Sequence, residues 1–556
     1  MNFLLSFLFV LISHSAPAAP KELKIGISQE FDSLHQSVSG MLVSHYIYYS
    51  VGRPLAKLDA KGQWQPSLAL KIPSLKNKDA RYVMTSRGQQ VQADWIINKK
   101  AKWSDGTPVT CADFQLALDV ANTDTVSISN KENFTIVEKI EWSEKTPQKC
   151  LFKYAPNRWD YTQIGRFIPL PNHLERPIYE KYKNQKEGYE KNSLYQTAPT
   201  TPGLYNGPYQ VVDYKPGSHV VVAPNQHFYG KSPEFEKIIF RIIPNTGTLE
   251  ANLQSGEIDI ITMFGYSIEQ ALDFEKRSQK QKNPLKFYFT SSMSIEHIDL
   301  DLNHPALKDK KVRQALLYGM NRKELVQTLF EGKQDIADQF FHPVDPWYTR
   351  SKKIRQYNYD YSKAQQLLDQ AGWKLNPQDN LRYRDGQKLS FRLMTTAGNK
   401  SREVVQTYIQ NEWKKLGIEI LIKNEPARVF FGETLKKKTY GGAALFAWSL
   451  LPEKSPKAFL HSSAIPTEAN NWSGRNSNSW SNKRADQLLD KMDSSFDSKE
   501  RTRAAQQFSE LYTEELPALP LYYKTEIVVA PQKLVGLEPT GHLFMETLSI
   551  ENWKME

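Results

Sequence analysis

Residues 101–114 read AKWSDGTPVTCADF, and they carry the clearest local structural signal in the chain. The Asp-Gly and Thr-Pro pairs in this stretch favour a turn, because glycine and proline readily adopt the backbone angles that turns need. Thr110 stands where a helix N-cap belongs, and Asp113 supplies the acid of a shortened capping box. The stretch therefore predicts a turn followed by a helix over residues 111–121.

Outward from this stretch, strand-like and helix-like segments alternate along the chain. The predicted strands cover residues 22–28, 91–97, 209–214, 219–223, 237–243, 258–263, 418–422, 442–448 and 521–529. The predicted helices cover residues 246–255, 405–416, 427–437 and 501–515, and others begin at Asp309, Asn321 and Ser362. Strand, helix and strand in succession are typical of a βαβ unit, so we predict a mixed α/β fold.

Length and composition exclude several classes of protein. The chain has 556 residues, enough for about three or four structural units. With 40% hydrophobic and 24% charged residues it can build a large core, which excludes a disordered chain. The net charge of +11 is scattered rather than clustered, so we expect no nucleic-acid partner.

The first residues predict export. Residues 3–12 form an apolar run, shorter than the roughly 20 residues that span a bilayer. Ala16 and Ala18 fit the small-x-small cleavage pattern, so we expect a signal peptide over residues 1–18 and a periplasmic protein. No cysteine follows the run to carry a lipid anchor. A buried N-terminal element is the alternative.

Export also affects how the two cysteines, Cys111 and Cys150, are interpreted. They form no C-x-x-C pair, which excludes a cysteine-rich metal site. An oxidising compartment permits a disulfide between them, which would close a loop of about 40 residues and contribute about 3–4 kcal/mol. Two buried free thiols are the alternative.

Short catalytic motifs are absent from the sequence. It has no H-E-x-x-H helix, no G-x-S-x-G elbow, no phosphate-binding P-loop and no G-x-G-x-x-G dinucleotide loop. We therefore name no catalytic residue, no metal ligand and no cofactor. Many active sites leave no local motif, so an exported α/β hydrolase stays open as an alternative.

Five stretches together resemble the extracellular solute-binding proteins of ABC importers, the family of the oligopeptide-, dipeptide- and nickel-binding proteins (family 5). They are residues 101–114, 206–230, 253–259, 302–322 and 514–523. They follow the family's order and span most of the chain, although Cys111 replaces the family's usual alanine. Most of the residues in these motifs are expected to be structural, with Arg313 as an ion-pair residue.

The resemblance implies a two-lobe periplasmic-binding-protein fold with two chain crossings between the lobes. Lobe I would comprise residues 19–50, 205–284 and 522–556, with an extra subdomain over 51–204 packed on it and lobe II over 285–521. It also implies a monomer that captures an oligopeptide or similar solute between the lobes and delivers it to an ABC permease and ATPase.

The resemblance places Trp448, at the end of a predicted strand, in the ligand pocket; a core tryptophan is the alternative. In peptide-binding members an acidic residue three places later pairs with the peptide's ammonium group, but here that position is Leu451. Glu453 is a substitute candidate, or a solvated loop carboxylate. This departure puts recognition of a free peptide N-terminus in doubt.

Other candidate ligand contacts come from two loops. Glu30 and Phe31 follow the first strand, where lobe I members often meet ligand; a plain strand-to-loop junction is the alternative. Trp472 and Asn476 belong to a polar and aromatic segment suited to a cleft, or to an exposed loop.

Within the binding class, nickel-chelate, oligosaccharide and antimicrobial-peptide ligands stay open. Nickel is disfavoured because the sequence shows no histidine cluster. The basic charge and Leu451 together favour anionic solutes.

Overall fold

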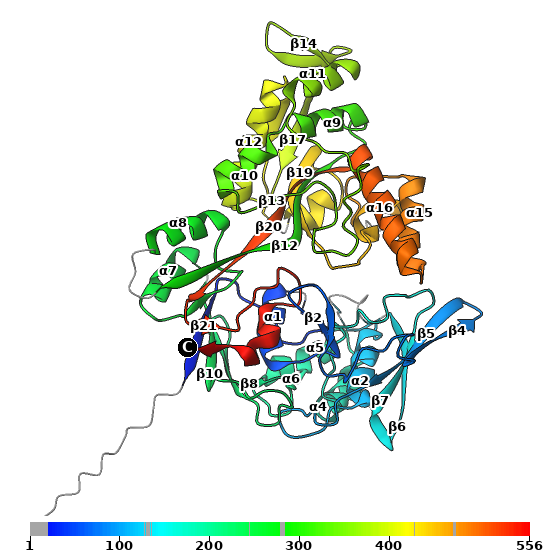
Figure 1. The fold of residues 1–556 in the computed structure, drawn as a ribbon, viewed down its shortest axis with the longest axis vertical. Helices are drawn as coiled ribbons and strands as arrows, with labels where there is room; N and C mark the ends of the chain where they lie inside the picture. Colours follow the sequence, from blue (N-terminus) through cyan, green and yellow to red (C-terminus); the bar gives the residue numbers. More distant parts are fainter. Residues whose placement is uncertain are drawn as a thin grey trace, which may run out of the picture.

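The computed structural model describes residues 21–39, 41–126, 128, 134, 136–243, 245–278, 284–426, 429–470 and 474–556. The predicted signal peptide and Trp472 lie outside these residues. Figure 1 shows a broad lower part and an upper part stacked along the long axis. Two long strands, β12 (Leu285–Leu300) and β20 (Ala518–Pro531), run between the two parts.

One mixed sheet extends through both parts. Its other strands are β1 (Glu22–Ile27), β8 (Tyr209–Lys215), β9 (His219–Pro224), β10 (Lys237–Ile242), β11 (Ile260–Ile261), β13 (Asp335–Ile336), β17 (Ser390–Met394), β18 (Glu419–Ile422) and β19 (Gly442–Ser449). Within the described residues their order is β18-β17-β19-β12-β20-β11-β1-β10-β9-β8, with β13 beside β20. The predicted mixed α/β class is confirmed.

The two long strands lie side by side where the parts meet. They pair antiparallel, and their register shifts between Ser291 and Ile295. On one side of the shift β20 also pairs with β11, and on the other side β12 pairs with β19. Because both crossings are adjacent in one sheet, a small change of backbone angles at the shift would move one part relative to the other.

The predicted βαβ unit, made of strand 418–422, helix 427–437 and strand 442–448, corresponds to β18, η1 (Phe430–Leu435) and β19 in the upper part. β18 and β19 do not pair with each other; both pair in parallel with β17, which lies between them. Helix α12 (Lys400–Lys415) connects β17 to β18, and the Asn399 side chain caps it by accepting from the Arg402 N–H. The helix buries Val405, Ile409 and Trp413, the apolar stripe that the sequence shows.

The remaining elements of the upper part cover the sheet and its ends. They are α9 (Lys310–Tyr318), α10 (Arg322–Phe330), α11 (Tyr361–Gln370), β14 (Lys374–Asn376), β15 (Leu381–Arg384), β16 (Gln387–Lys388), η1 (Phe430–Leu435), α14 (Lys457–Leu460), η2 (Ser462–Ala464), η3 (Glu468–Asn470), α15 (Lys483–Ser494) and α16 (Ser498–Glu515). The helix expected near 427–437 is the π-helix η1 in its described part.

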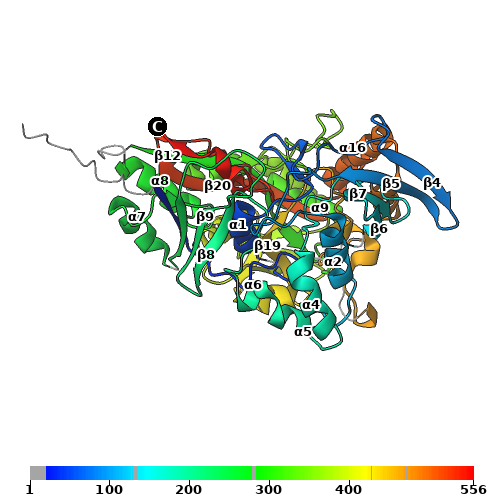
Figure 2. The ribbon, with the colours of Figure 1, turned by 90° about the horizontal axis from the view of Figure 1, so that it is seen from below.

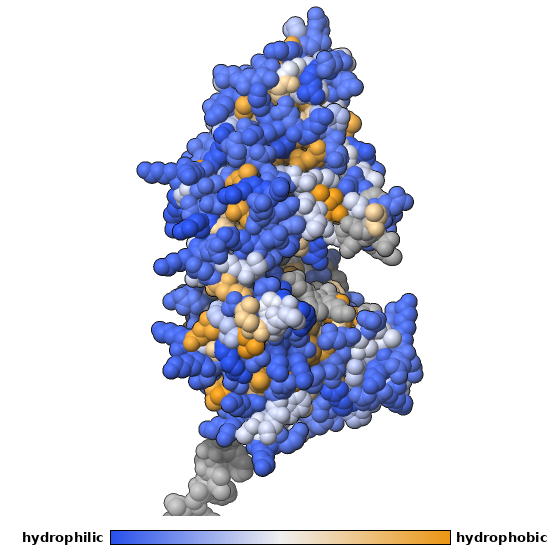
Figure 3. Space-filling view, turned by 90° about the vertical axis from the view of Figure 1, so that its right-hand side faces the viewer, coloured by the Kyte–Doolittle hydropathy of each residue, from blue (hydrophilic) through white to orange (hydrophobic). Residues whose placement is uncertain are grey.

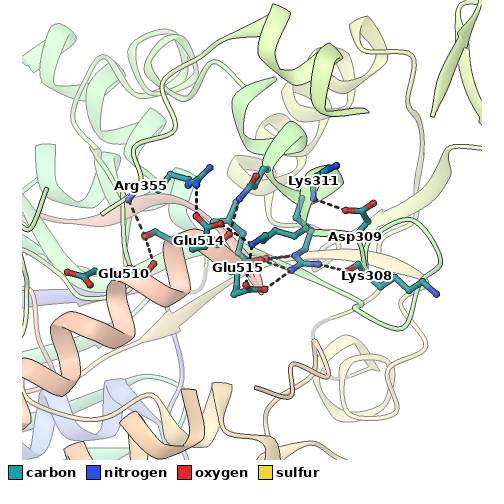
Figure 4. A network of polar contacts seen from close by, with 12 residues as sticks. Lys308, Asp309, Lys311, Arg355, Glu510, Glu514 and Glu515 are labelled. Carbon is teal, nitrogen blue, oxygen red and sulfur yellow. Dashed lines mark hydrogen bonds and ion pairs between the residues drawn. The ribbon is translucent and has the colours of Figure 1, made fainter. Parts of the chain in front are cut away.

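A polar network connects the start of α9 to the end of α16 (Figure 4). Arg313 is buried, and its guanidinium donates to the carbonyl oxygens of Glu515 and Leu516 at 2.6–3.0 Å. The same group also donates to the carbonyls of Leu307 and Lys308. A cation at a helix C-terminus interacts favourably with the unpaired carbonyls there. Arg313 is therefore structural, chiefly as a cap for α16.

The lower part contains a second sheet, ordered β4-β5-β7-β6. Its strands are β4 (Ala80–Thr85), β5 (Gly88–Ile96), β6 (Val137–Ser143) and β7 (Thr146–Tyr154). The other elements are α1 (Leu42–Val51), β2 (Ala56–Leu58), β3 (Trp64–Pro66), α2 (Cys111–Ala121), α4 (Asn172–Tyr182), α5 (Gly188–Asn192), α6 (Leu194–Thr197), α7 (Thr246–Gln254), α8 (Ile268–Ser278), β21 (Leu534–Val535), η4 (Glu546–Asn552) and β22 (Lys554–Met555).

The opening stretch of the sequence analysis forms the predicted turn and helix. α2 begins after Thr110 with the complete capping box, and the Thr110 N–H donates to the Asp113 carboxylate at 2.7 Å. The second oxygen of Asp113 accepts from the Asn172 N–H at the start of α4. One buried carboxylate thus fixes the starts of two helices.

A disulfide joins Cys111, at the start of α2, to Cys150 in the middle of β7. We expect the variant Cys111→Ser/Cys150→Ser to lose about 3–4 kcal/mol of unfolding free energy, because its unfolded chain regains the entropy of a loop spanning 39 residues. Urea unfolding with and without reductant measures this. Reductant should shift the wild type and leave the double variant unchanged; equal midpoints for oxidised wild type and double variant would contradict the prediction.

Among the described residues, buried hydrophobic side chains form three clusters. The first joins β1 and β8–β10 with residues of the 51–204 region. The second joins residues of α7, β11 and α8 with one side of the upper sheet, and the third lies on the other side of that sheet. Figure 2, seen from below, places the β4–β7 sheet at the opposite end from α7 and α8, beside α16. Figure 3 shows a mostly hydrophilic face, hollowed at mid-height where the two parts meet.

Candidate functional site

A cavity of about 530 Å³ opens at the carboxyl end of β19, beside the junction of the two parts. β19, η1, α14 and the loop after η3 supply its walls. The lining residues are Phe431, Leu435, Lys436, Phe446, Ala447, Trp448, Ser449, Phe459, Pro466, Gly474, Arg475 and Ser477. Because four of them are aromatic, the cavity can hold apolar or flat groups.

Trp448 forms the central wall of this cavity. Its side chain is 3% exposed, and its ring stacks on His297 with centroids 3.7 Å apart. On α14 the Phe459 ring also stacks against it, at 5.3 Å. Since rings on two elements hold Trp448, its position is preorganised for a ligand that contacts the cavity wall.

A buried polar layer supports this wall. His297 and Asp299 are two residues apart on β12, so their side chains share one face of the sheet. The His297 Nε2 lies 3.3 Å from the Asp299 carboxylate. That carboxylate also accepts from the Ser477 hydroxyl, which fixes the loop on the far side of the cavity. The layer therefore connects the tryptophan wall to the loop wall.

Two cations stand at the mouth of the cavity. Lys436 follows η1, Arg475 belongs to the loop, and both are exposed. The Arg475 guanidinium lies 6.0 Å from the centroid of the Phe459 ring. None of the lining residues is an aspartate or a glutamate. The cavity thus combines aromatic walls with positive charge.

Among the predicted site residues, Asn476 lies next to the cavity but turns its amide into the loop. The amide nitrogen donates to the carbonyls of His461 and Trp480, at 3.0 and 2.9 Å, and the amide oxygen accepts from the Trp480 N–H. Asn476 is fully buried. Its observed contacts hold the loop that carries Arg475 and Ser477.

Glu453 lies beyond the end of β19, away from the cavity lining. Its N–H donates to the Asp345 carboxylate at 3.2 Å. Burial raises the pKa of Glu453, and the Arg501 guanidinium opposes that shift. Leu451 is half-buried and does not line the cavity.

The structure does not bring Glu30 and Phe31 to this cavity. Phe31 packs against Tyr214 on β8, with ring centroids 5.9 Å apart. Glu30 is exposed, and its carboxylate lies near Gly217 in the β8–β9 turn. Glu30 and Phe31 therefore both lie against the β8–β9 hairpin. Neither of them lines the cavity at Trp448.

A smaller cavity of about 20 Å³ lies between the two parts and shares Ser449 with the larger one. Leu42 and Met263 line it from the lower part, and Leu450 lines it from the upper part. Glu526, on the crossing strand β20, also faces it. Burial raises the pKa of Glu526 to about 8, and the nearby Glu546 carboxyl adds to the shift. The junction thus holds an acid that is largely protonated near neutral pH.

The raised pKa of Glu526 predicts a pH-dependent stability difference. Between the unperturbed pKa of 4.5 and the folded value of about 8, the folded protein retains a proton that the unfolded chain has released. The contribution of Glu526 to the free energy of unfolding therefore falls as the pH rises through this range. We expect Glu526→Gln to melt close to the wild type at pH 5 and above it at pH 8.

Calorimetry at the two pH values measures this difference. Glu468→Gln, at an exposed position, serves as the control and should follow the wild type at both. A Glu526→Gln variant that also follows the wild type at both would contradict the prediction.

The described chain shows no metal cluster and no membrane helix. No group of three or more His, Cys, Asp or Glu side chains in it is arranged to hold a metal ion. Among the described helices, none has both the length and the apolar character that a bilayer crossing requires.

The fold and the cavity define a class: a two-lobed binding protein of mixed α/β structure, with two adjacent crossing strands and a cavity beside them. The chain belongs to the bacterial extracellular solute-binding proteins, family 5, whose middle-region model matches residues 92–471. Proteins of this family bind solutes and are not enzymes, which favours binding over the hydrolase alternative.

Individual relatives cover most of the chain. The oligopeptide-binding protein AppA of Bacillus subtilis (strain 168) is 25% identical over 533 residues, covering 95% of this chain and 90% of AppA. The oligopeptide-binding protein of Thermus thermophilus, solved with a pentapeptide, is 26% identical with a TM-score of 0.71, covering 96% of this chain and 98% of that one. The nickel-binding periplasmic protein of Escherichia coli (strain K12) is 28% identical over 266 residues, covering 47% of this chain and 49% of that protein.

Sequence reasoning missed most of the cavity wall. Phe431 and Lys436 lie where a regular helix was expected, and His297 lies on a strand that was not predicted. Arg475 lies within the segment singled out as polar and aromatic, but its neighbours were chosen instead. The sequence signal that could have indicated part of this wall is the clustering of basic and aromatic residues near Trp448.

Proposed function

We propose that this protein is the periplasmic substrate-binding component of an ABC importer. It captures an oligopeptide or peptide-like solute between two lobes, as a monomer, and delivers it to a membrane permease and its ATPase. The observation that carries this proposal is the aromatic cavity at Trp448, beside the strands that cross between the two parts. Full-length similarity to an oligopeptide-binding protein and to a pentapeptide complex supports a peptide ligand.

The proposal includes a division of the chain into lobes. Lobe I comprises residues 19–50, 205–284 and 522–556, the extra subdomain 51–204, and lobe II 285–521. In support, β1 and β8–β11 come from lobe I and β17–β19 from lobe II. The hinge of this proposal would lie in β12 and β20, the two strands that run between the parts.

Trp448 is the ligand contact on which the proposal chiefly rests. Glu453, Glu30 and Phe31 do not line the cavity, and they remain proposed contacts only for a solute long enough to extend beyond it. Asn476 acts by holding the loop wall.

A thermal screen against peptide pools tests the proposal. A ligand present at 100–1,000 times its Kd stabilises a protein by about 2.7–4.1 kcal/mol, so binding pools should raise the melting temperature by several degrees. The screen includes a nickel–histidine chelate and oligosaccharide pools as competing solutes. Stabilisation by one of these and by no peptide would contradict a peptide ligand. Cleavage of a peptide or ester pool, abolished by one cavity substitution, would contradict the binding role.

A further inference from the structure

We propose that the cavity beside Trp448 selects a carboxylate on the solute, held next to an apolar or aromatic group. The inference rests on the proposed function, since it names the chemistry that the same site recognises. The carboxylate would come from an acidic side chain or from the C-terminus of the solute.

The charge of the cavity wall is the first observation. Lys436 and Arg475 line the mouth, and within the described residues neither of them forms an ion pair. The acid on η1, Glu433, pairs with Lys437 at 2.6 Å; Lys437 chiefly, and Lys436 in addition, lower the pKa of its carboxyl. The acid beneath the wall, Asp299, is fully buried and accepts from Ser477. The lining therefore presents two cations whose charge is available to a ligand.

The neighbours of Arg475 in its loop fix its backbone at the mouth of the cavity. Gly474 has a φ of 112°, and a Cβ at this position would lie 2.1 Å from the Ala464 carbonyl oxygen. Only glycine permits this close approach of the two backbones. On the other side of Arg475, the Asn476 side chain makes the buried hydrogen bonds described above. The backbone of Arg475 is thus fixed from both neighbours, while its guanidinium stays exposed.

The opposite wall is also a specialised structure. η1 is a π-helix, a rare conformation that occurs frequently at functional sites. It directs Phe431 and Leu435 to the cavity lining, and Lys436 follows directly. A guanidinium and an ammonium group above aromatic walls suit a carboxylate attached to an apolar group, because the charge meets its partner while the apolar part is buried.

The same arrangement disfavours an ammonium group in the cavity. A cationic group would meet Lys436 and Arg475 with no lining carboxylate to compensate, and like charges at close range repel. Leu451 supplies no acid after Trp448. A peptide ammonium would therefore lie outside this cavity.

Calorimetric titration of the full protein with alanine pentapeptides that contain one phenylalanine tests the inference. Each remaining position in turn carries Glu, Gln or Lys, and each peptide is made as the free acid and as the C-terminal amide. We expect Glu to bind roughly tenfold or more tightly than Lys at one position, or the free acid to exceed the amide by a similar factor. The first outcome assigns the carboxylate to a side chain, and the second assigns it to the C-terminus.

The second part of this experiment reverses the charge of the two residues at the mouth of the cavity. Arg475→Glu and Lys436→Glu should each remove the preference for the carboxylate, whereas the control Lys414→Glu, at an exposed position on α12 and off the cavity lining, should keep it. Circular dichroism and melting temperature check that the variants fold. Equal Kd values for all charge forms in the wild type, or an unchanged preference in Arg475→Glu, would overturn this inference alone. Failure of every pentapeptide and every peptide pool to bind would overturn the proposed function as well.

Discussion

Trp448→Ala should weaken solute binding by at least about thirtyfold, because it removes the central wall of the cavity. Truncating a buried aromatic residue at the core of a binding site typically costs about 2 kcal/mol or more of binding free energy. The ring stacks on both His297 and Phe459, so its loss also frees these neighbours to move into the space. Calorimetric Kd values for the best peptide of the thermal screen measure the effect.

Two further variants separate binding from folding. Trp448 is buried, so Trp448→Ala should also lose about 3–5 kcal/mol of stability. Trp448→Phe keeps an aromatic wall and should weaken binding only modestly. The matched control Trp413→Phe removes the same indole bulk from a fully buried site on α12 and should lower stability while leaving Kd unchanged. A Trp448→Ala protein that folds and binds with the wild-type Kd would refute the placement of the site.

Trp159→Ala should weaken binding by about tenfold to a hundredfold, mainly through faster dissociation. Trp159 belongs to the 51–204 region, yet its contacts lie in the upper part. The Arg501 guanidinium lies 3.6 Å from its ring centroid, and its indole N–H donates to the Met492 carbonyl at 2.8 Å. Its ring also meets Trp347 at 5.9 Å.

These contacts exist only while the two parts are together. A cation–π contact and a hydrogen bond contribute about 1.5–3 kcal/mol, which sets the expected loss of binding if closure traps the solute. Surface-plasmon resonance measures the dissociation rate. The control Trp142→Ala, on β6 in the same region, removes a partly buried tryptophan that packs on the first hydrophobic cluster. Equal dissociation rates for Trp159→Ala and Trp142→Ala would contradict the closing role of Trp159.

The sequence predicted those helices and strands whose formation depends on neighbouring residues, such as caps and apolar stripes. The capping box of Thr110 and Asp113 started α2 where expected, and the apolar stripe of α12 placed Val405, Ile409 and Trp413 inside. β12 was not predicted, because its middle contains the polar Ser291, Ser292 and Ser294, which interrupt the alternation of apolar and polar residues that indicates a strand.

The candidate site likewise combines a residue that the sequence indicated with residues that it did not. The resemblance directed attention to Trp448, which lines the cavity in the structure. The roles of Asn476 and Arg475 depend on how one loop folds back on Ala464, which no spacing in the sequence reveals. The π-helical backbone of η1 also lies outside what helix periodicity predicts.

Native mass spectrometry of the protein, purified without unfolding, tests the central claim most directly. We predict an added mass that fragments into amino-acid residues, present in the wild type and in Trp413→Phe and absent from a folded Trp448→Ala. The bare mass in every sample, with no gain on adding the peptide pools, would contradict the claim.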